Sequence, residues 1–589
     1  MKILFLTTAF NGMAQRLWLE LDRLNHLVAV QTDESVEEME RAVEDFQPDL
    51  IVAPYLKSKI PESIWKKHLC LIVHPGIVGD RGASSLEWAI LKGEEEWGVT
   101  ILQAVEKMDA GPVWACRTFP LRAVSKAETY RCEVTQAATA ALLDALQKLE
   151  SGTFRPLSAN EFPAARKGKW NPKIKQKDLA FSWKDQTEDI YTKIRAADSD
   201  PGVLVQLNDK SYLAYGAQKE HSLKGKPGEI LAQKDLAICV ATADAAIWIR
   251  QLKRAEAQGI KLPAMLVLKE LQNHIPQANE KVSYREIDCR IEGEIAYLSF
   301  DFYNGAMSTG QCERLRHAFI QAKQNEKVKI IVLTGGRDFW SNGIHLNCIE
   351  AAENPADESW ANIQAMDDLI LEIIQSTDHY IISALRGNAG AGGVALALAA
   401  DKVLARKGIV INPHTKNMGL YGSEYWTYLL PKRIGKEKAL QFTEECLPWG
   451  TEIAKEIGLI DDYYGQTPEE FLSFVKQEAQ KIAGLSWFDK LIKAKKFQRL
   501  RDERYKPLAK YREEELREMH RNFYENNRGY HEKRRAFVHK TAQIHLPENL
   551  YSKRRSIYRK RKWESVQYEE QSPCPDCSAR PEHRTSKHL

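Results

Sequence analysis

The sequence predicts a layered α/β fold divided into several domains, with a helical extension at its C-terminal end. The first 110 residues and a stretch that begins near Val282 both alternate short apolar runs with segments of helical periodicity, the pattern of parallel strands joined by crossover helices. A hairpin pattern separates these two stretches. The chain has 589 residues, several times the roughly 150 of a typical domain, so one core cannot organise all of it. We therefore expect at least three domains.

Four apolar runs define the first unit. They are KILFLTTAF, HLVAVQT, DLIVAPYL and CLIVHPG, and each is short enough to be a strand of a parallel sheet. The last run leads into residues 74–82, where Pro75 and three glycines interrupt regular structure. Ligands of open α/β sheets bind beyond the carboxyl ends of the strands. We therefore expect residues 74–82 to form a functional loop.

The second unit follows a linker at 162–173 that contains Pro and Lys. An amphipathic helix is predicted over 187–197, and the runs GVLVQL and SYLAYG flank Asn208 and Asp209. Such a pair between two strand-like runs favours a tight β-hairpin. We expect a small β-rich domain that ends near residue 275.

The third unit repeats the order strand, helix and glycine-rich turn. The runs EIAYLSFDF and KIIVLTGG lie on either side of a helix predicted over 311–325, and YIISALRGNAGAGGVALALAADKVLA and IVINP follow a long helix. After about Leu485 the chain becomes polar, basic and helix-prone, with Trp, Phe and Tyr interspersed. This composition is typical of helices that pack on a neighbouring domain.

The composition of the chain bears on its location in the cell. No run approaches the 18 apolar residues that a membrane-spanning helix needs, and the N-terminus reads as a strand rather than a leader. The ten cysteines have no regular spacing before Cys574 and Cys577, which fits thiols in a reducing compartment. We expect a globular cytoplasmic protein that does not bind membranes.

The basic charge is a property of the C-terminal region. Residues 490–562 contain 24 Lys and Arg against 9 Asp and Glu, whereas the whole chain has a net charge of only +4. Such a segment could contact nucleic acid, a polyphosphate ligand or an acidic domain of the same chain. We expect nucleic acid least.

A first site is predicted at residues 72–113, which read IVHPGIVGDRGASSLEWAI and then WGVTILQAVEKMDAGPV. The loop His74, the pair Arg81 and Gly82, the GVT strand start and the Met-Asp-Ala-Gly turn resemble the formyltransferases that use N10-formyltetrahydrofolate. The resemblance covers residues 1–160, and the hairpin module resembles the C-terminal β-domain of that family. It implies a Rossmann-like domain that binds the folate, with Arg81 and Gly82 at the binding site.

Formyl transfer passes through a tetrahedral oxyanion, so the site needs a donor near the carbonyl oxygen and a group that moves protons. His74 and Asp109 can supply both, and we expect His74 to be exposed enough to titrate and Asp109 to orient it. The family usually has an Asn two residues before the His, where this chain has Ile72. A thiolate needs less help than an amine, because it attacks already deprotonated. The departure at Ile72 therefore favours a thiol acceptor.

A second site is predicted where two glycine-rich segments occur, at 335–346 and 388–393. These segments resemble the crotonase (enoyl-CoA hydratase/isomerase) superfamily over residues 285–485. The resemblance implies an oxyanion hole for an acyl-CoA thioester, with the amides of Ile344 and Gly392 as donors and Gly343 and Gly393 in the coenzyme-binding segments. Glycine lets a backbone N–H approach the thioester oxygen, and a helix N-terminus adds partial positive charge.

The acids of this site differ from those of a hydratase. Ala395 occupies the position of the first hydratase glutamate, and the region of the second reads Pro413-His414-Thr415, so we do not expect ordinary hydratase activity. Glu424 lies where isomerases and dehalogenases of the superfamily keep an acidic residue. We expect Glu424 to act as the base, with Tyr421 as a second candidate and His345 in a structural role.

The order of the two units resembles the HypX-type maturation proteins of [NiFe] hydrogenase over nearly the whole chain. That resemblance implies carbon monoxide synthesis: formyl transfer from N10-formyltetrahydrofolate to coenzyme A, then decarbonylation of formyl-CoA. It requires no metal and implies small-molecule substrates and hydrogenase maturation proteins as partners. The expected domains are formyltransferase-like (1–160), β-rich (161–280), crotonase-like (281–485), basic helical extension (486–570) and tail (571–589).

Two other function classes stay open on the residues alone. One is a formyltransferase that acts on an amine, and the other is a non-catalytic assembly scaffold, since a hydratase acid is already lost at Ala395. Cys574 and Cys577 with two nearby histidines resemble half of a zinc site, but a single Cys-x-x-Cys lacks the second spaced pair. We therefore expect no metal.

Overall fold

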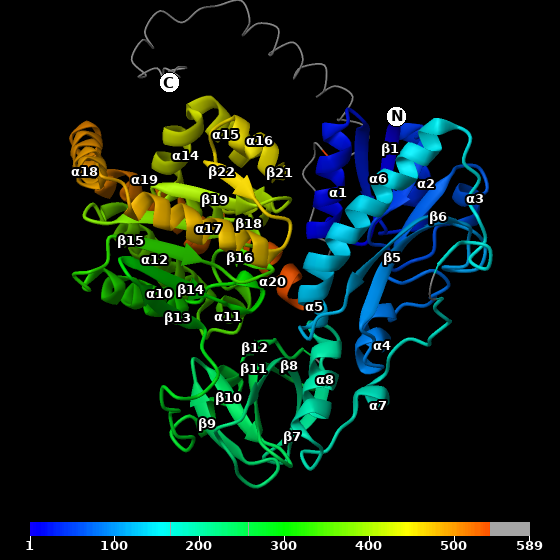
Figure 1. Cartoon of the computed structure of the whole chain (residues 1–589), viewed down its shortest axis with the longest axis horizontal. Coiled ribbons are helices and arrows are strands. Elements are labelled where there is room, and N and C mark those ends of the chain that lie inside the picture. Colours follow the sequence, from blue (N-terminus) through cyan, green and yellow to red (C-terminus); the bar gives the residue numbers. More distant parts are fainter. Residues whose placement is uncertain (165–166, 257, 542–549, 551–589) are drawn as a thin grey trace, which may run out of the picture.

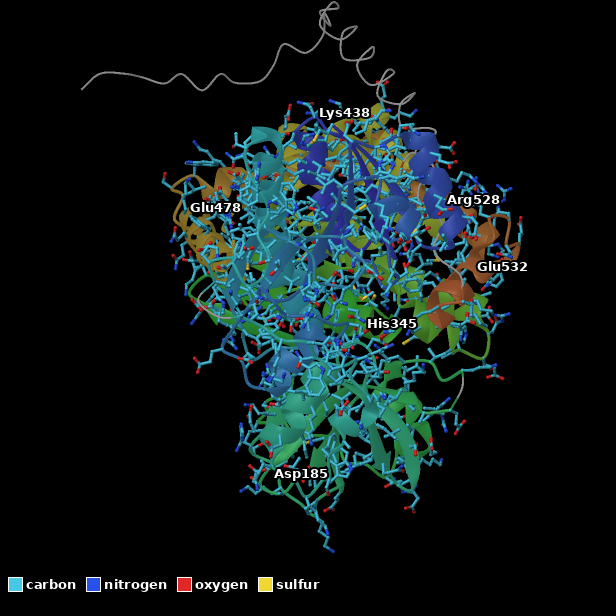
Figure 2. All side chains as sticks on the ribbon, turned by 90° about the vertical axis from the view of Figure 1, so that its right-hand side faces the viewer. Asp185, His345, Lys438, Glu478, Arg528 and Glu532 are labelled. Atoms are coloured by element: carbon cyan, nitrogen blue, oxygen red, sulfur yellow. The ribbon has the colours of Figure 1, made fainter. Side chains whose placement is uncertain are left out.

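The computed structural model describes residues 1–164, 167–256, 258–541 and 550. Figure 1 shows two large lobes side by side, the N-terminal one in blue and cyan and the third unit in green to orange, with the β-rich lobe beneath them. Helix α20 (Tyr530–His539) lies where the two large lobes meet. In Figure 2, Asp185 marks the far end of the β-rich lobe, and His345 lies near the junction of that lobe with the rest.

The N-terminal lobe is a six-stranded sheet in the order β2-β1-β3-β4-β5-β6, with helices on both faces. The four predicted runs form β1 to β4 and pair in parallel, as expected, but the pairs β4–β5 and β5–β6 are antiparallel, so the sheet is mixed. Helices α1 and α6 cover one face and α2 and α3 the other, which buries the strands on both sides. The bounds are β1 (Lys2–Thr7), α1 (Gly12–Arg23), β2 (Leu27–Thr32), α2 (Val36–Phe46), β3 (Leu50–Ala53), α3 (Glu62–Trp65), β4 (Cys70–His74), α4 (Ser85–Leu91), β5 (Glu96–Gln103), β6 (Val113–Pro120), α5 (Lys126–Thr129) and α6 (Thr135–Ser151).

The β-rich lobe is an antiparallel sheet in the order β7-β8-β11-β10-β9, with β12 beside β11. The predicted hairpin is confirmed: Leu207 pairs with Lys210, and Asn208 and Asp209 both adopt the positive φ that a tight primed turn requires. The predicted helix is α8. The bounds are α7 (Gln176–Leu179), α8 (Thr187–Ala197), β7 (Val203–Leu207), β8 (Lys210–Glu220), β9 (Ile230–Lys234), β10 (Ala237–Ala241), β11 (Ala246–Arg254), β12 (Leu262–Pro263) and α9 (Ala264–Val267).

The third unit has a six-stranded sheet, β13-β14-β15-β17-β19-β22, and a four-stranded one, β16-β18-β20-β21. Only the end pairs β13–β14 and β20–β21 are antiparallel within these two sheets. Each glycine-rich segment follows a strand of the large sheet and enters the small one. The strands are β13 (Ile287–Glu292), β14 (Ile295–Phe300), β15 (Ile330–Thr334), β16 (Phe339–Ser341), β17 (Tyr380–Leu385), β18 (Asn388–Gly390), β19 (Lys402–Arg406), β20 (Val410–Asn412), β21 (Trp449–Gly450) and β22 (Asp462–Tyr464).

Helices surround these two sheets and continue into the C-terminal region. The long helix α12 packs on α10 and α19, and residues from all three belong to one hydrophobic core. The C-terminal helices therefore complete the third unit instead of forming a domain of their own, as the sequence predicts. The helices are α10 (Thr309–Lys323), α11 (Leu346–Glu350), α12 (Pro355–Gln375), α13 (Gly392–Leu398), α14 (Trp426–Ile434), α15 (Lys436–Glu445), α16 (Thr451–Glu456), α17 (Pro468–Ala483), α18 (Phe488–Tyr505), α19 (Leu508–Tyr524) and α20.

Polar contacts join the lobes near their common junction. Arg131, which follows α5, forms an ion pair with Asp338 and donates to the side-chain oxygen of Asn304 at 2.9 Å. The hydroxyl of Tyr303 donates to Asp198 of the β-rich lobe. In the part of the chain that the structure describes, no helix combines the length and hydropathy needed to span a bilayer.

Candidate functional site

The first site lies at the carboxyl end of β4, where the strand gives way to the predicted loop. His74 is the last residue of β4, and only 4% of its surface is exposed, so the expectation of an exposed, freely titrating histidine was wrong. The loop folds back over the ring: the hydroxyl of Ser85 and the indole N–H of Trp97 both donate to the carbonyl of Pro75. The histidine is therefore held rigidly inside the sheet edge.

The ring nitrogen Nε2 of His74 lies 3.0 Å from Oδ2 of Asp80, a residue to which the sequence assigned no role. Asp80 is itself buried, and the amide of Asn171 from the linker donates to its other oxygen at 3.3 Å. At Gly76 an added Cβ would stand 2.5 Å from both Nε2 and Asp80 Oδ2. Glycine is therefore required there for the imidazole and carboxylate to meet.

Two carboxylates act on His74. Its Nδ1 lies 3.6 Å from Oδ1 of Asp109, beyond hydrogen-bond length but close enough for a strong electrostatic interaction. Burial lowers the pKa of the imidazole, but the hydrogen bond to Asp80 and the charge of Asp109 outweigh it, so the pKa of His74 is raised above its usual value. The buried ring therefore retains a proton at a higher pH than a free histidine.

The structure brings Asp109 and Gly82 together with His74 but places Arg81 elsewhere. The amide of Gly82 donates to Oδ2 of Asp109 at 3.2 Å, and both residues line the large cavity described below. Arg81 pairs through its backbone with Trp170 of the linker and is not among the residues that line this cavity. The predicted role of Arg81 in folate binding therefore remains a prediction, and its side chain does not line the cavity.

The second site is built where the two glycine-rich segments meet. Gly343 has a φ of +74°, and a Cβ added to it would stand 3.1 Å from the amide nitrogen of Gly392. This close approach places the neighbouring Ile344 beside Gly392, which is the first residue of α13, as expected from the sequence. Gly393 packs against Ser341, where a Cβ would stand 2.2 Å from the carbonyl oxygen, and does not line the large cavity.

Glu424 lies directly over Gly392. A Cβ at Gly392 would stand 2.0 Å from Oε1 of Glu424, so the carboxyl occupies the space that any larger residue would fill. The side chain is buried rather than solvated, with 4% of its surface exposed, and its Oε2 accepts a hydrogen bond from the amide of Ser423. The predicted oxyanion-hole glycine and the predicted acid are therefore in contact.

The surroundings make Glu424 a weak acid. Burial, followed by the negative charge of Asp367, raises the pKa of Glu424 to about 8. Tyr421, the other candidate from the same loop, packs against Trp426 with ring centroids 5.5 Å apart and does not line the large cavity. Of the two, only Glu424 reaches the space where a substrate would bind.

Two histidines complete this end of the cavity. His345 is the N-cap of α11, where its Nδ1 accepts from the amide of Cys348, and burial lowers its pKa to about 4. His414 lies in the segment where hydratases keep their second acid, and its Nδ1 donates to the carbonyl of Asn412 at 2.8 Å. Ala395 is buried in α13 and does not line the large cavity.

A single cavity of about 1550 Å³ joins the two sites. His74, Gly82 and Asp109 line one part of it, and Ile344, Gly392 and Glu424 line another. The lining residues come from all three lobes and include Arg131, Lys261 and Lys540, and the charges of Arg131 and Lys540 both act on Lys261. Burial lowers the pKa of Lys261 to about 8.

These three cations and Asp80 were not singled out in the sequence. Asp80 had a usable signal, because it lies only six residues after His74 in the same loop. Arg131, Lys261 and Lys540 are far apart in the chain and meet only through the packing of the lobes. Clusters of three or more side chains that could hold a metal are absent from the described residues; Cys574 and Cys577 lie outside them.

Comparison with protein families divides the chain as the fold does. The model described as formyl transferase matches residues 21–146, and formyl transferase, C-terminal domain, matches 173–267. The model described as enoyl-CoA hydratase/isomerase matches 290–542. The N-terminal part is also similar to methionyl-tRNA formyltransferase of Bacillus licheniformis, with 28% identity over 36% of this chain and 68% of that one.

Two relatives cover nearly the whole chain. Hydrogenase maturation factor HoxX of Bradyrhizobium diazoefficiens is 42% identical over 93% of this chain and 96% of its own. The crystal structure of HypX from Aquifex aeolicus, in complex with tetrahydrofolic acid, has a TM-score of 0.90 and 45% identity over 94% of this chain and 99% of that one. The protein is therefore a member of the HypX and HoxX family of hydrogenase maturation factors, with a formyltransferase and an enoyl-CoA hydratase-like domain in one chain.

Proposed function

We propose that this protein makes carbon monoxide for [NiFe]-hydrogenase maturation in two steps. A formyl group moves from N10-formyltetrahydrofolate to the thiol of coenzyme A, and formyl-CoA is then cleaved to carbon monoxide and coenzyme A. The observation that carries this proposal is the single cavity lined by both sites. The folate in the HypX structure and the maturation role of the relatives support it.

In the first step, a thiolate adds to the formyl carbon, and negative charge develops on the formyl oxygen. The protonated ring of His74 faces that charge. Asp80 and Asp109 keep that proton on the ring. When the C–N bond breaks, His74 gives a proton to the departing folate nitrogen, and the thiol has lost an equivalent proton on ionising. Ile72 lines the same cavity and supplies no polar group, which favours a thiolate over an amine as the nucleophile.

In the second step, the amides of Ile344 and Gly392 polarise the thioester oxygen. Glu424, once ionised, removes the formyl proton while the C–S bond breaks and carbon monoxide forms. The carboxyl then returns that proton to the thiolate, so the step neither gains nor loses protons. The contact between Glu424 and Gly392 supports this assignment, because the base must lie beside the carbonyl that it acts on.

Three cations that line the cavity fit the charge of the coenzyme. Arg131, Lys261 and Lys540 line the cavity from three different lobes and would bind the phosphates of coenzyme A. With its phosphates bound there, coenzyme A would have both the formyl-transfer site and the decarbonylation site in the same cavity as its thiol. Lys540 comes from the basic C-terminal region, so part of that charge would serve the ligand.

The test is to incubate the purified protein with formyltetrahydrofolate and coenzyme A and to trap carbon monoxide on deoxyhaemoglobin. Carbon monoxide that appears only with both substrates supports the proposal. A formylated amine in place of carbon monoxide would favour an amine formyltransferase, and turnover of neither substrate would favour an assembly scaffold. Glu424→Gln should accumulate formyl-CoA without carbon monoxide, and normal output from it would contradict the base assignment.

A further inference from the structure

The turn that carries Glu424 is held by a helix of the C-terminal extension. Glu515 of α19 is fully buried, and its two oxygens accept from two different amides of the turn: Oε2 from Tyr425 at 2.9 Å and Oε1 from Thr427 at 2.8 Å. The hydroxyl of Thr427 donates to the same carboxyl. A single glutamate on α19 therefore fixes both residues that follow Glu424 by one and three positions.

Asp367 of α12 holds the other side of the same turn. It is also fully buried, and its Oδ1 accepts from the amide of Glu424 at 2.8 Å. The hydroxyl of Ser423 donates to both oxygens of Asp367, at 3.0 and 2.9 Å. The two helices thus bind the turn through its backbone amides from opposite ends.

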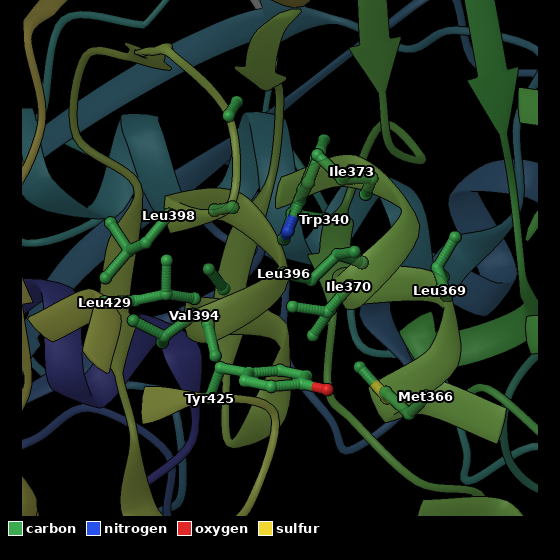
Figure 3. Close-up of a cluster of buried hydrophobic side chains, with 14 of the residues drawn as sticks. Trp340, Met366, Leu369, Ile370, Ile373, Val394, Leu396, Leu398, Tyr425 and Leu429 are labelled. Carbon is green, nitrogen blue, oxygen red and sulfur yellow. The ribbon is translucent and has the colours of Figure 1, made fainter. Parts of the chain in front are cut away.

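The turn needs this support because its backbone is strained. Glu424 and Tyr425 have φ values of 62° and 59°, a left-handed conformation that costs residues other than glycine free energy and persists only where the surroundings impose it. Figure 3 shows the ring of Tyr425 in the hydrophobic cluster with Met366, Ile370 and Val394. Packing of this ring and the hydrogen bonds to the two carboxylates hold the conformation together.

The same contacts bring three carboxyl groups close together, those of Glu424, Asp367 and Glu515. Burial, ahead of the other causes, raises the pKa of Asp367 to about 7 and that of Glu515 to about 8. The nearest cation is Arg512, whose Nε lies 3.8 Å from Asp367. The titratable and charged groups around Glu424 include Asp367, Glu515, Arg512 and Cys312 from three helices, together with the phenol of Tyr425 in the turn and Asp368 beside Arg512.

We propose that Asp367 and Glu515 are positioning residues of the second site, which hold the 423–427 turn so that the carboxyl of Glu424 lies against Gly392. This inference rests on the proposed role of Glu424 as the base. Asp367 has a second effect, because its negative charge opposes ionisation of Glu424 and so delays the appearance of the active base as pH rises. The extension after residue 485 is, on this view, part of the second active site.

The first test is Glu515→Gln, assayed with formyl-CoA supplied directly. A glutamine has one accepting oxygen, so one of the two turn amides would face an NH₂ group instead. We expect kcat for carbon monoxide release to fall at least tenfold while KM stays within about twofold, because the amides of Ile344 and Gly392 still bind the thioester. The control is Glu514→Gln, a neighbour that is 53% exposed and pairs with Lys506.

The second test is Asp367→Asn, which keeps the size of the side chain while the hydroxyl of Ser423 can turn to accept a hydrogen bond. Removing the charge should shift the pH midpoint of carbon monoxide release toward acid by roughly one unit. A purely structural role would lower activity at every pH and leave the midpoint in place. Normal kcat for Glu515→Gln, or an unchanged midpoint for Asp367→Asn, would overturn the inference.

The urea unfolding transition of the third unit serves as the folding check for each variant, and normal tetrahydrofolate release shows that the first site, in another lobe, is unaffected. If Glu515→Gln fails this check, the pH midpoint of carbon monoxide release by Asp367→Asn tests the inference on its own. The wild-type protein separates this inference from the proposed function: if it makes no carbon monoxide from formyl-CoA, the proposed function fails, whereas wild-type turnover with normal behaviour of both variants refutes only the positioning role.

Discussion

Gly392 leaves no room for a side chain while Glu424 keeps its position, because the carboxyl of Glu424 fills the space of a Cβ. We expect Gly392→Ala to displace Glu424 and to reduce carbon monoxide release at least tenfold, with Gly392→Val more severe, while tetrahydrofolate release stays normal. Separate assays of the two steps check this. Gly310→Ala is the control, since a Cβ there meets only a side-chain nitrogen of Arg314 at 3.9 Å. Unchanged decarbonylation by Gly392→Ala would contradict the geometry proposed for the second step.

The pKa of Glu424, about 8, makes the second step sensitive to pH. Only the ionised carboxyl accepts the formyl proton, so carbon monoxide release from formyl-CoA should rise about tenfold between pH 7 and pH 9. The measurement is kcat at saturating formyl-CoA across that range. A rate that falls as pH rises would show that Glu424 acts as an acid instead.

The first step should respond to pH in the opposite sense through His74. Its raised pKa depends on Asp80, so Asp80→Asn should lower that pKa and move the loss of formyl transfer at high pH toward acid. The readout is tetrahydrofolate release as a function of pH for both proteins. His74→Ala should lose about a hundredfold or more of this release, whereas replacement of the exposed His221 should have no effect.

Residue-level reasoning from the sequence found groups that carry recognisable motifs but not the groups that support them. His74, Asp109, Ile344, Gly392 and Glu424 all line the cavity found in the structure, because their motifs fix local backbone geometry. Asp367 and Glu515 act through contacts made between separate helices. Helical periodicity could have indicated Glu515. This residue lies on the buried face of α19 with Leu508, Met519 and Phe523, where a charged residue is unexpected.

At the scale of elements, the sequence predicted the strands and the hairpin well because apolar runs and turn residues are local signals. It did not predict that β5 runs antiparallel to its neighbours β4 and β6, because strand direction depends on the length and route of the connection. The linker offered no periodicity either, yet it packs on the first site through Asn171. Irregular segments are placed by tertiary contacts that a single sequence does not display.

Helix α17 allows a test that is independent of both sites. Thr467 and Glu470 form a capping box at its N-terminus, and the helix packs on the large sheet of the third unit. Thr467→Ala should lower the free energy of unfolding by about 1 kcal/mol and leave carbon monoxide output unchanged. Urea denaturation, followed at the transition of the third unit, measures the difference. A loss of activity without a loss of stability would connect this outer helix to the site.

At the scale of the whole molecule, the shared cavity predicts that the intermediate passes between the sites inside one protein. A mixture of His74→Ala and Glu424→Gln must exchange formyl-CoA through solution, so it should make carbon monoxide only after a lag and more slowly on dilution. Wild-type protein should show neither effect. Carbon-13 from formyltetrahydrofolate should also reach carbon monoxide undiluted by unlabelled formyl-CoA in solution. Equal behaviour of mixture and wild type would contradict internal transfer.

The three cations of the cavity lie far apart in the sequence, so the ribosome adds them at different times. Arg131 belongs to the N-terminal lobe, Lys261 follows it in the β-rich lobe, and Lys540 follows both. A nascent chain that has folded only its formyltransferase lobe therefore contains Arg131 but neither Lys261 nor Lys540. On the proposed function, a formyltransferase lobe made without the later parts of the chain would bind coenzyme A weakly, because two of the three cations that hold its phosphates are missing.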